Sequence, residues 1–203
     1  TDSNKIVNVC HKLGIEVHKG SLNNVLDRFY ETALPEKPDW VVRLTSDCPL
    51  IDAIEIDKVI QFAIDKDLDY ASNTLTPTFP DGIDIEVFKF SALEKAWKEA
   101  KEKHQREHVM PYLYEGTNLQ SATLNLATGV SPKGFRIALV NHIPDYGDLR
   151  WTVDTPEDLE FIREIFARFD NDDFGWKDIL SLLEKEPELV KINANVHHKT
   201  LKE

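Results

Sequence analysis

Residues 39–51 read DWVVRLTSDCPLI, and this stretch decides the fold. Its first part, residues 39–44, is a compact apolar run of the kind that forms a buried strand in a parallel sheet. A polar turn follows, in which Pro49 restricts the backbone and biases Cys48 away from helix. The turn presents Asp47 just beyond the carboxyl end of the strand, which is where open α/β sheets bind their ligands.

A second acid is expected at an equivalent position near the end of the chain. Residues 150–154 read RWTVD, which predicts a strand that ends in Asp154. Residues 155–158 read TPED, a strong helix start with Thr as N-cap and Pro at the first position. Alone, either acid is explained by ordinary turn or helix-start chemistry. Together, Asp47 and Asp154 at one sheet edge supply the oxygen ligands that Mg²⁺ prefers.

Helices alternate with strands along the rest of the chain. The expected helices lie in a segment opened by Gly20-Ser21, after Asp52, and at 2–13, 91–103, 106–114, 156–169, 176–185 and 187–193. The expected strands lie at 15–18, 39–44, 70–72, 84–88, 119–127, 135–141 and 150–154. This alternation predicts an α/β layered fold with a mainly parallel sheet, in which the helices are the crossovers. The strands at 119–127 and 135–141 are expected to form a small antiparallel part.

Length and composition indicate an ordinary globular protein. The 203 residues are 41% hydrophobic and 30% charged, which suggests a single domain over residues 1–203. The 24 basic and 36 acidic residues give a net charge of −12, which argues against a nucleic-acid partner. A helix that spans a membrane needs about 20 consecutive apolar residues. No apolar run in the sequence is nearly that long, so no membrane partner is expected. Two cysteines, Cys10 and Cys48, do not make a disulfide framework, and a cytoplasmic location is expected.

Five short motifs follow one another along the chain, and their order resembles a known family. They are residues 20–21 with 25–30, then 39–51, 80–88, 106–109 and 149–159. Over nearly its whole length the chain is similar to the SpsF-like (spore coat polysaccharide) cytidylyltransferases. These are relatives of the CMP-ketodeoxyoctonate and CMP-sialate synthetases. The resemblance implies a three-layer GT-A-like nucleotidyltransferase fold.

The resemblance also implies an activity, a cofactor and an assembly. The expected reaction transfers a cytidylyl group from CTP to a sugar hydroxyl and releases pyrophosphate. The sugar would be acidic or phosphorylated, and the product would serve surface polysaccharide or glycan biosynthesis. In the family pattern, Asp47 and Asp154 are the catalytic residues and the ligands of Mg²⁺. Family members tend to form homodimers, and residues 119–141 are the expected interface.

The sugar is expected near residues 80–84, which read PDGID. Glycine permits a backbone turn that other residues resist, and acid side chains accept hydrogen bonds from hydroxyls. The substrate-binding residues that the resemblance implies are Asp81, Gly82, Asp84, Glu86, Arg106 and His108. A solvated acidic hairpin is the alternative for the acids, and a surface or helix-cap role is the alternative for the histidine.

The nucleotide side of the expected site has no counterpart in this sequence. The family pattern opens with a strand and a loop rich in Gly, Arg and Lys, which grips the triphosphate and the base. The chain starts at Thr1 and its one methionine is Met110, so we expect this first strand and loop to be missing from it. Two alternatives stay open: a non-catalytic binding module without the loop, and a transferase of the same fold that uses another nucleoside triphosphate.

Overall fold

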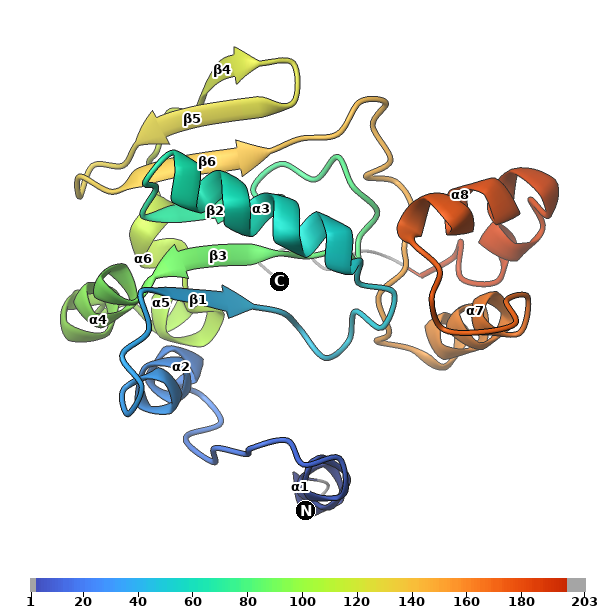
Figure 1. Ribbon diagram of the computed structural model, residues 1–203, viewed down its shortest axis with the longest axis horizontal. Coiled ribbons are helices and arrows are strands. Elements are labelled where there is room, and N and C mark those ends of the chain that lie inside the picture. Colours follow the sequence, from blue (N-terminus) through green and yellow to red (C-terminus); the bar gives the residue numbers. More distant parts are fainter. Residues whose placement is uncertain (1–2, 197–203) are drawn as a thin grey trace.

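The computed structural model describes residues 3–196, which contain a six-stranded sheet flanked by helices (Figure 1). The strand order in the sheet is β1-β3-β2-β6-β5-β4. The strands are β1 (Trp40–Arg43), β2 (Tyr70–Ser72), β3 (Glu86–Lys89), β4 (Gln120–Thr123), β5 (Leu126–Val130) and β6 (Arg136–Val140). The helices are α1 (Ser3–Lys12), α2 (Val25–Ala33), α3 (Ala53–Asp65), α4 (Phe90–Glu99), α5 (Lys103–His108), α6 (Pro111–Tyr114), α7 (Pro156–Phe166), α8 (Trp176–Lys185) and the 3₁₀ helix η1 (Leu189–Lys191).

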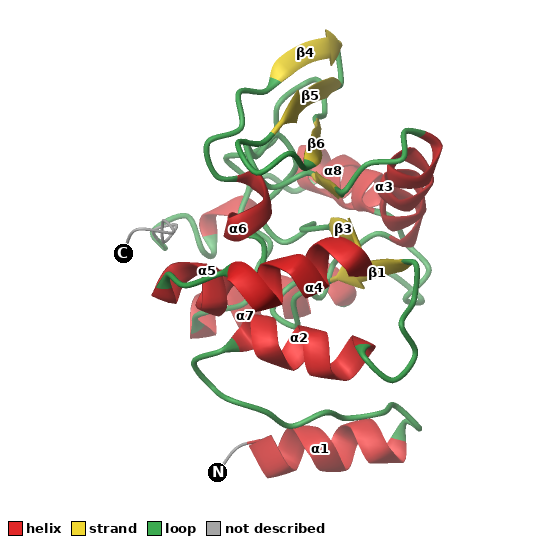
Figure 2. Ribbon diagram, turned by 90° about the vertical axis from the view of Figure 1, so that its left-hand side faces the viewer, coloured by secondary structure: helices red, strands yellow, loops and turns green. Residues whose placement is uncertain are grey.

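Helices cover both faces of the sheet (Figure 2). On one face, Val59 of α3 packs in a cluster with Ala71 of β2 and Val87 of β3. On the other face, Tyr70 and Phe88 belong to a cluster with side chains of α2, α4 and α6. Successive side chains of a strand point to opposite faces, so one strand contributes side chains to the clusters on both faces. The predicted three-layer α/β fold is therefore confirmed.

A third cluster of buried side chains lies among α7 and α8, beyond the carboxyl end of β1 (Figure 1). Trp151 and Trp176 are each 1% exposed and are among its largest members. Oδ2 of Asp52 accepts a hydrogen bond from Trp176 N at 2.9 Å. Its Oδ1 caps α3 by accepting from the backbone N–H of Ile54 and Glu55. One carboxylate therefore joins the starts of α3 and α8.

The prediction of a mainly parallel sheet is wrong. Among the described strands, β2 and β6 pair in parallel, and the other four pairings are antiparallel. The cause is β3, which follows β2 through a loop without a crossover helix and lies between β1 and β2. β1, β2 and β6 nevertheless run in one direction, so their carboxyl ends share one edge of the sheet.

Two predicted strands and one strand boundary are also wrong. Residues 15–18 form a loop. Residues 150–154 contribute one isolated bridge, between Arg150 and Asp81, because the other backbone hydrogen bonds of this segment go to loops. The strand predicted at 119–127 is divided by a turn into β4 and the start of β5.

Helix starts follow the predicted caps in part. Asp52 caps α3 and Thr155 caps α7, as predicted. The helix predicted to open at Gly20-Ser21 begins at Val25 instead, because the side chain of Asn24 accepts the capping hydrogen bond. The helices predicted at 156–169 and 187–193 are shorter, and the second of them is η1.

The helices predicted at 91–103 and 106–114 are three helices in the structure. α4 ends at Glu99 and already begins at Phe90, one residue before the predicted cap, Ser91. α5 and α6 are separated by Val109, whose φ of 72° interrupts the helical backbone. Pro111 then starts α6, at the position where a helix tolerates proline.

α1 confirms the helix predicted at 2–13, yet it contributes no buried residue. Its apolar side chains are open to solvent, with Ile6 65% and Val9 55% exposed. Figure 2 shows α1 apart from the helix layer and joined to α2 by an extended loop. None of the described helices is long and apolar enough to cross a membrane.

Candidate active site

The turn that follows β1 is ordered by its own hydrogen bonds and presents Asp47 at the sheet edge. Cys48 N donates to the carbonyl oxygen of Thr45 at 3.2 Å, and the Thr45 Oγ1 and Cys48 Sγ atoms lie 2.9 Å apart. Burial raises the pKa of the Cys48 thiol to about 12, so this side chain stays neutral and packs. The side chain of Asp47 is half-buried.

The same turn is joined to the segment that precedes α7. The carbonyl oxygen of Asp47 accepts hydrogen bonds from Val153 N at 2.8 Å and from Thr152 Oγ1 at 3.1 Å. Asp154 is the next residue, and its side chain is 44% exposed. The structure thus brings together the two segments that carry Asp47 and Asp154, although they are far apart in the sequence.

The start of α7 is built around the carboxylate of Asp158, which has no exposed surface. Its Oδ2 accepts from the backbone N–H of Asp154 at 3.1 Å and of Thr155 at 3.0 Å. Burial works against the charged form, but hydrogen bonds from Arg150 and Asn193 hold the pKa of Asp158 well below its usual range. The ionised carboxylate therefore fixes the backbone that carries Asp154.

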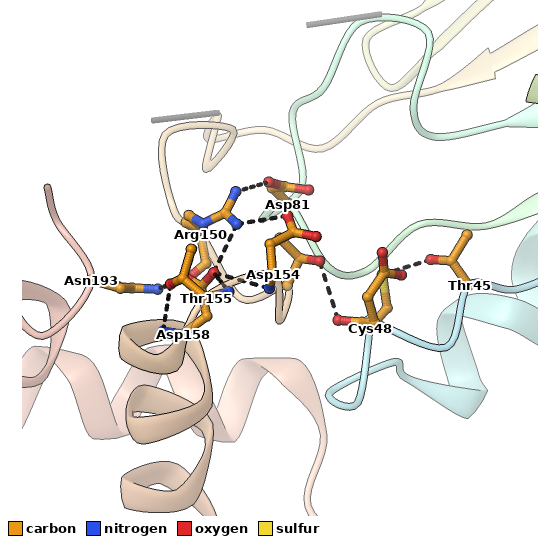
Figure 3. A network of polar contacts seen from close by, with 10 residues as sticks. Thr45, Cys48, Asp81, Arg150, Asp154, Thr155, Asp158 and Asn193 are labelled. Atoms are coloured by element: carbon orange, nitrogen blue, oxygen red, sulfur yellow. Dashed lines mark hydrogen bonds and ion pairs between the residues drawn. The ribbon is translucent and has the colours of Figure 1, made fainter. Parts of the chain in front are cut away.

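The guanidinium of Arg150 joins three carboxylates (Figure 3). Nε and Nη2 donate to Asp158 at 2.9 and 2.8 Å, and Nη2 also donates to Oδ2 of Asp154 at 2.8 Å. Nη1 lies 3.4 Å from Oδ2 of Asp81. The hydrogen bond to Asp158 raises the pKa of Arg150 further above its ordinary value, against the effect of burial. This arginine is therefore the centre of the cluster.

The loop at 80–84 is packed against the same segment. Asp81 N donates to the carbonyl oxygen of Leu149 at 2.9 Å, and Trp151 N donates to that of Asp81 at 2.6 Å. Gly82 has a φ of +114°, and a Cβ there would lie 2.6 Å from the backbone carbon of Trp151. The approach of the two backbones therefore requires glycine at this position.

Negative charge is crowded around Asp84, the last residue of this loop. Burial is the main cause that raises its pKa to about 6, and the carboxylates of Asp81, Glu86 and Asp47 add to the shift. A hydrogen bond from the Gly82 backbone works in the opposite direction. The loop and the turn after β1 thus place their acids close enough to disfavour one another's charge.

The donor set at this edge fits a magnesium ion that shares its coordination with a substrate. Within residues 3–196 no group of three or more His, Cys, Asp or Glu side chains is arranged to hold a metal. Mg²⁺ is commonly bound through one or two carboxylates, with phosphate oxygens and waters as the other ligands. Asp47 and Asp154 offer two such carboxylates on adjoining segments, and neither is fully buried.

The carboxylate of Glu86 is bonded by side chains of the neighbouring strands. Glu86 is 6% exposed, forms an ion pair with Arg43 on β1, and accepts a hydrogen bond from the Tyr70 hydroxyl at 2.7 Å. Both partners lie on the strands next to β3, so the carboxylate is used within the sheet. Contact between Glu86 and a sugar stays a prediction.

Arg106 and His108 belong to α5, on the helix layer that covers the sheet. The Arg106 guanidinium donates to the carbonyl oxygens of Ala100 at 3.0 Å and Trp97 at 2.9 Å, which are free at the end of α4. His108 is half-buried in the last turn of α5. Their predicted roles toward a substrate are not tested by these contacts.

Two cavities of the described part of the molecule bear on where the site lies. The larger, of about 520 Å³, lies at the opposite end of β1 and is lined by Lys37, Trp40 and Phe90 among others. The smaller, of about 420 Å³, borders Arg150 and Asn193. The walls of these two cavities include neither Asp47 nor Asp154, so the gathering of acids, rather than a cavity, identifies the candidate site.

Asp158 and Asn193 are site residues that the sequence reasoning missed. Asp158 carries a local signal, since it is the third helical residue after Thr155 and so belongs to a capping box. Asn193 follows η1 and is 4% exposed. It comes into contact with the cluster only through the tertiary fold, and no local sequence pattern predicts this contact.

The three-layer α/β fold, with acids at the edge where β1, β2 and β6 end, places the candidate site where open α/β sheets bind their ligands. The family model described as cytidylyltransferase matches residues 1–189, and the chain belongs to this family. It is a nucleotidyltransferase.

The chain is also similar to individual proteins. The chain is 38% identical over 202 residues to the uncharacterized protein MJ1063 of Methanocaldococcus jannaschii, covering 100% of this chain and 76% of that protein. It is 32% identical over 181 residues to the spore coat polysaccharide biosynthesis protein SpsF of Bacillus subtilis, covering 88% and 69% respectively. A solved cytidylyltransferase from Leptospira borgpetersenii superposes with a TM-score of 0.83 at 28% identity, over 96% of this chain and 76% of that one.

Proposed function

We propose that this protein transfers a cytidylyl group from CTP to an acidic or phosphorylated sugar and releases pyrophosphate, with Mg²⁺ as cofactor. The observation that carries the proposal is the junction of two acidic segments, where Val153 N bonds to the carbonyl oxygen of Asp47. In a chain of the cytidylyltransferase family, this junction supports a phosphate and metal site.

In this proposal the residues of the chain act mainly by binding and orienting. Asp47 and Asp154 would hold Mg²⁺, which supplies positive charge against the phosphate groups when it is bound. Asp81 and Asp84 would accept hydrogen bonds from the sugar hydroxyls and turn one of them toward the nucleotide. The hydroxyl oxygen bonds to the α-phosphorus, the bond from that phosphorus to pyrophosphate breaks, and the hydroxyl proton is released.

The biological role, the assembly and the location are part of the same proposal. A relative with a spore coat polysaccharide biosynthesis name supports a product used in surface polysaccharide or glycan assembly. A homodimer through residues 119–141 is supported by β4, whose four residues are all exposed at the edge of the sheet. The free thiols of Cys10 and Cys48 support a reducing, cytoplasmic location.

Pyrophosphate release from CTP with a panel of sugars tests the activity in the full-length protein. Asp47→Ala and Asp154→Ala are expected to lower the rate by at least about 100-fold, the scale of a lost electrostatic contact to the reacting phosphate. Asp57→Ala, on the exposed side of α3, is the matched control and is expected to be neutral. Full activity of either site variant would refute the metal assignment. Faster turnover with another nucleoside triphosphate would refute CTP as the donor, and CTP binding without turnover would indicate a binding module.

A further inference from the structure

Arg150 forms ion pairs with three acids of the candidate site, and its own position is strongly fixed. Its side chain is 7% exposed. Two of its nitrogens face the two oxygens of Asp158 side by side, which is the strongest geometry for an arginine and a carboxylate. This pairing takes up one edge of the guanidinium.

Asn193 holds the same unit from the opposite side. Its Nδ2 donates to the carbonyl oxygen of Arg150 at 3.0 Å and to Oδ1 of Asp158 at 3.0 Å. The backbone of Arg150 is also bridged to Asp81. The guanidinium therefore cannot turn without breaking contacts to the loop at 80–84 and to α7, while Asn193 holds the backbone and the main carboxylate partner of this arginine.

The rest of the guanidinium faces the active-site acids. Nη2 bonds to Oδ2 of Asp154, and Nη1 approaches Asp81. Within residues 3–196, Oδ1 of Asp154 accepts no hydrogen bond, and the side chain is 44% exposed. One oxygen of Asp154 is thus held by the protein, and the other is open toward solvent.

We propose that Arg150 is a positioning residue, which holds the Asp154 carboxylate so that its Oδ1 is directed toward the bound metal and nucleotide. Asn193 holds Asp158 and the backbone of Arg150, Asp158 fixes the guanidinium, and the guanidinium fixes Asp154. Arg150 also offsets the repulsion between Asp154 and the acids of the loop at 80–84. The inference rests on the proposed function, since it assigns how one ligand of that site is oriented.

The test compares Arg150→Lys, Asp154→Asn and the double variant. Lysine keeps the charge that Asp158 needs, but its ammonium lacks the planar fork that bonds both oxygens of Asp158 and also reaches Asp154. Mn²⁺ binding in the presence of CTP is measured by electron paramagnetic resonance, and the half-saturating Mg²⁺ concentration is taken from pyrophosphate release. Arg168→Lys is the matched control, because Arg168 also bonds two carboxylates, those of Glu164 and Glu186, but on the outer surface.

Arg150→Lys is expected to weaken Mn²⁺ binding and raise the half-saturating Mg²⁺ concentration about 10- to 100-fold, the usual effect of losing a group that orients a ligand. The KM for the sugar is expected to change less than the half-saturating Mg²⁺ concentration, because the backbone bridge between Asp81 and residue 150 is kept. In the Asp154→Asn background the same substitution is expected to add less than about twofold, because the two residues act as one unit. Asn193→Ala changes no charge and is expected to weaken Mn²⁺ binding in the same direction, which keeps the test valid if Arg150→Lys folds poorly.

Four results overturn the proposal. Wild-type Mn²⁺ affinity in folded Arg150→Lys shows that the residue has only a structural role, and so does an effect of equal size in Arg168→Lys. If the effects of Arg150→Lys and Asp154→Asn on Mn²⁺ binding multiply in the double variant, Arg150 acts independently of Asp154. Wild-type protein that neither binds Mn²⁺ nor releases pyrophosphate refutes the proposed function itself, and the positioning role with it.

Discussion

The loop that carries Asp81 and Asp84 is expected to tolerate no side chain at Gly82. Alanine there would take a φ of +114°, which costs an L-residue about 1–3 kcal/mol. Its Cβ would also lie 2.6 Å from the backbone carbon of Trp151, and backbone cannot move aside as a flexible side chain can. The loop must then shift and lose the hydrogen bonds from Asp81 N to Leu149 O and from Trp151 N to Asp81 O, at about 1 kcal/mol each.

Gly134→Ala separates the backbone strain from the lost packing as causes of the expected loss of stability. Gly134 has a φ of +85°, but a Cβ there would meet nothing within 4 Å. The reduced freedom of the unfolded chain offsets about 0.4–1 kcal/mol of the strain in both variants. We therefore expect the free energy of unfolding to fall by about 1 kcal/mol in Gly134→Ala and by about 3–4 kcal/mol in Gly82→Ala.

Urea unfolding followed by circular dichroism measures both values, and pyrophosphate release follows the consequence for the site. Gly82→Ala is expected to lose most activity because the loop moves away from Arg150, whereas Gly134→Ala keeps it. Equal losses of stability in the two variants would refute the close packing of the loop on residues 151–152. Full activity in Gly82→Ala would refute the role of this packing in the site.

Three further predictions concern pH, capping and assembly. Because the pKa of Asp84 is raised to about 6, the folded state holds this proton more tightly than the unfolded state, so stability falls as the pH rises from about 4 to about 6. Asp84→Asn is expected to remove that fall and to raise the free energy of unfolding by up to about 3 kcal/mol at pH 8. Urea unfolding in EDTA measures this, and an unchanged pH dependence of stability would contradict the burial argument. Asp52→Ala loses the cap of α3 and the bond to Trp176 N, so the free energy of unfolding is expected to fall by about 2–4 kcal/mol, whereas Asp57→Ala changes it by less than about 0.5 kcal/mol. Leu124, 77% exposed beside β4, is expected to contribute to the dimer, so sedimentation equilibrium should show Leu124→Glu as a monomer, and a wild-type monomer would rule this interface out.

The elements that the sequence predicted well are those with a local physical cause. Asp52 and Thr155 cap their helices because a short oxygen side chain next to a helix start is sufficient to do so. The sequence also predicted that the segments carrying Asp47 and Asp154 meet, but it gave the wrong reason. Residues 150–154 are not a strand of the sheet, and they reach the turn after β1 through the bonds of Thr152 and Val153 to the carbonyl oxygen of Asp47.

The parts that could not be predicted depend on contacts between distant segments. The pattern of residues 150–154 suits a strand, but which neighbour takes its backbone hydrogen bonds is decided by the loops that reach it. The direction of β3 depends on a loop without a crossover helix, which hydrophobic alternation does not reveal. Asn193 is an unremarkable residue in the sequence, and its two hydrogen bonds exist only once the C-terminal segment has packed beside α7.

The charges of the site explain why Arg150 makes so many contacts. Asp158 already neutralises this guanidinium by bonding two of its nitrogens, and the raised pKa of Asp84 shows that the acids of the loop still repel one another. An acidic edge of this kind is unfavourable for the folded protein alone and becomes favourable when a cation and its anionic ligand bind. A rigid arginine lowers the repulsion enough for folding without occupying both oxygens of Asp154. The site can therefore be ordered before its substrate binds and still have free carboxylate oxygens to offer it.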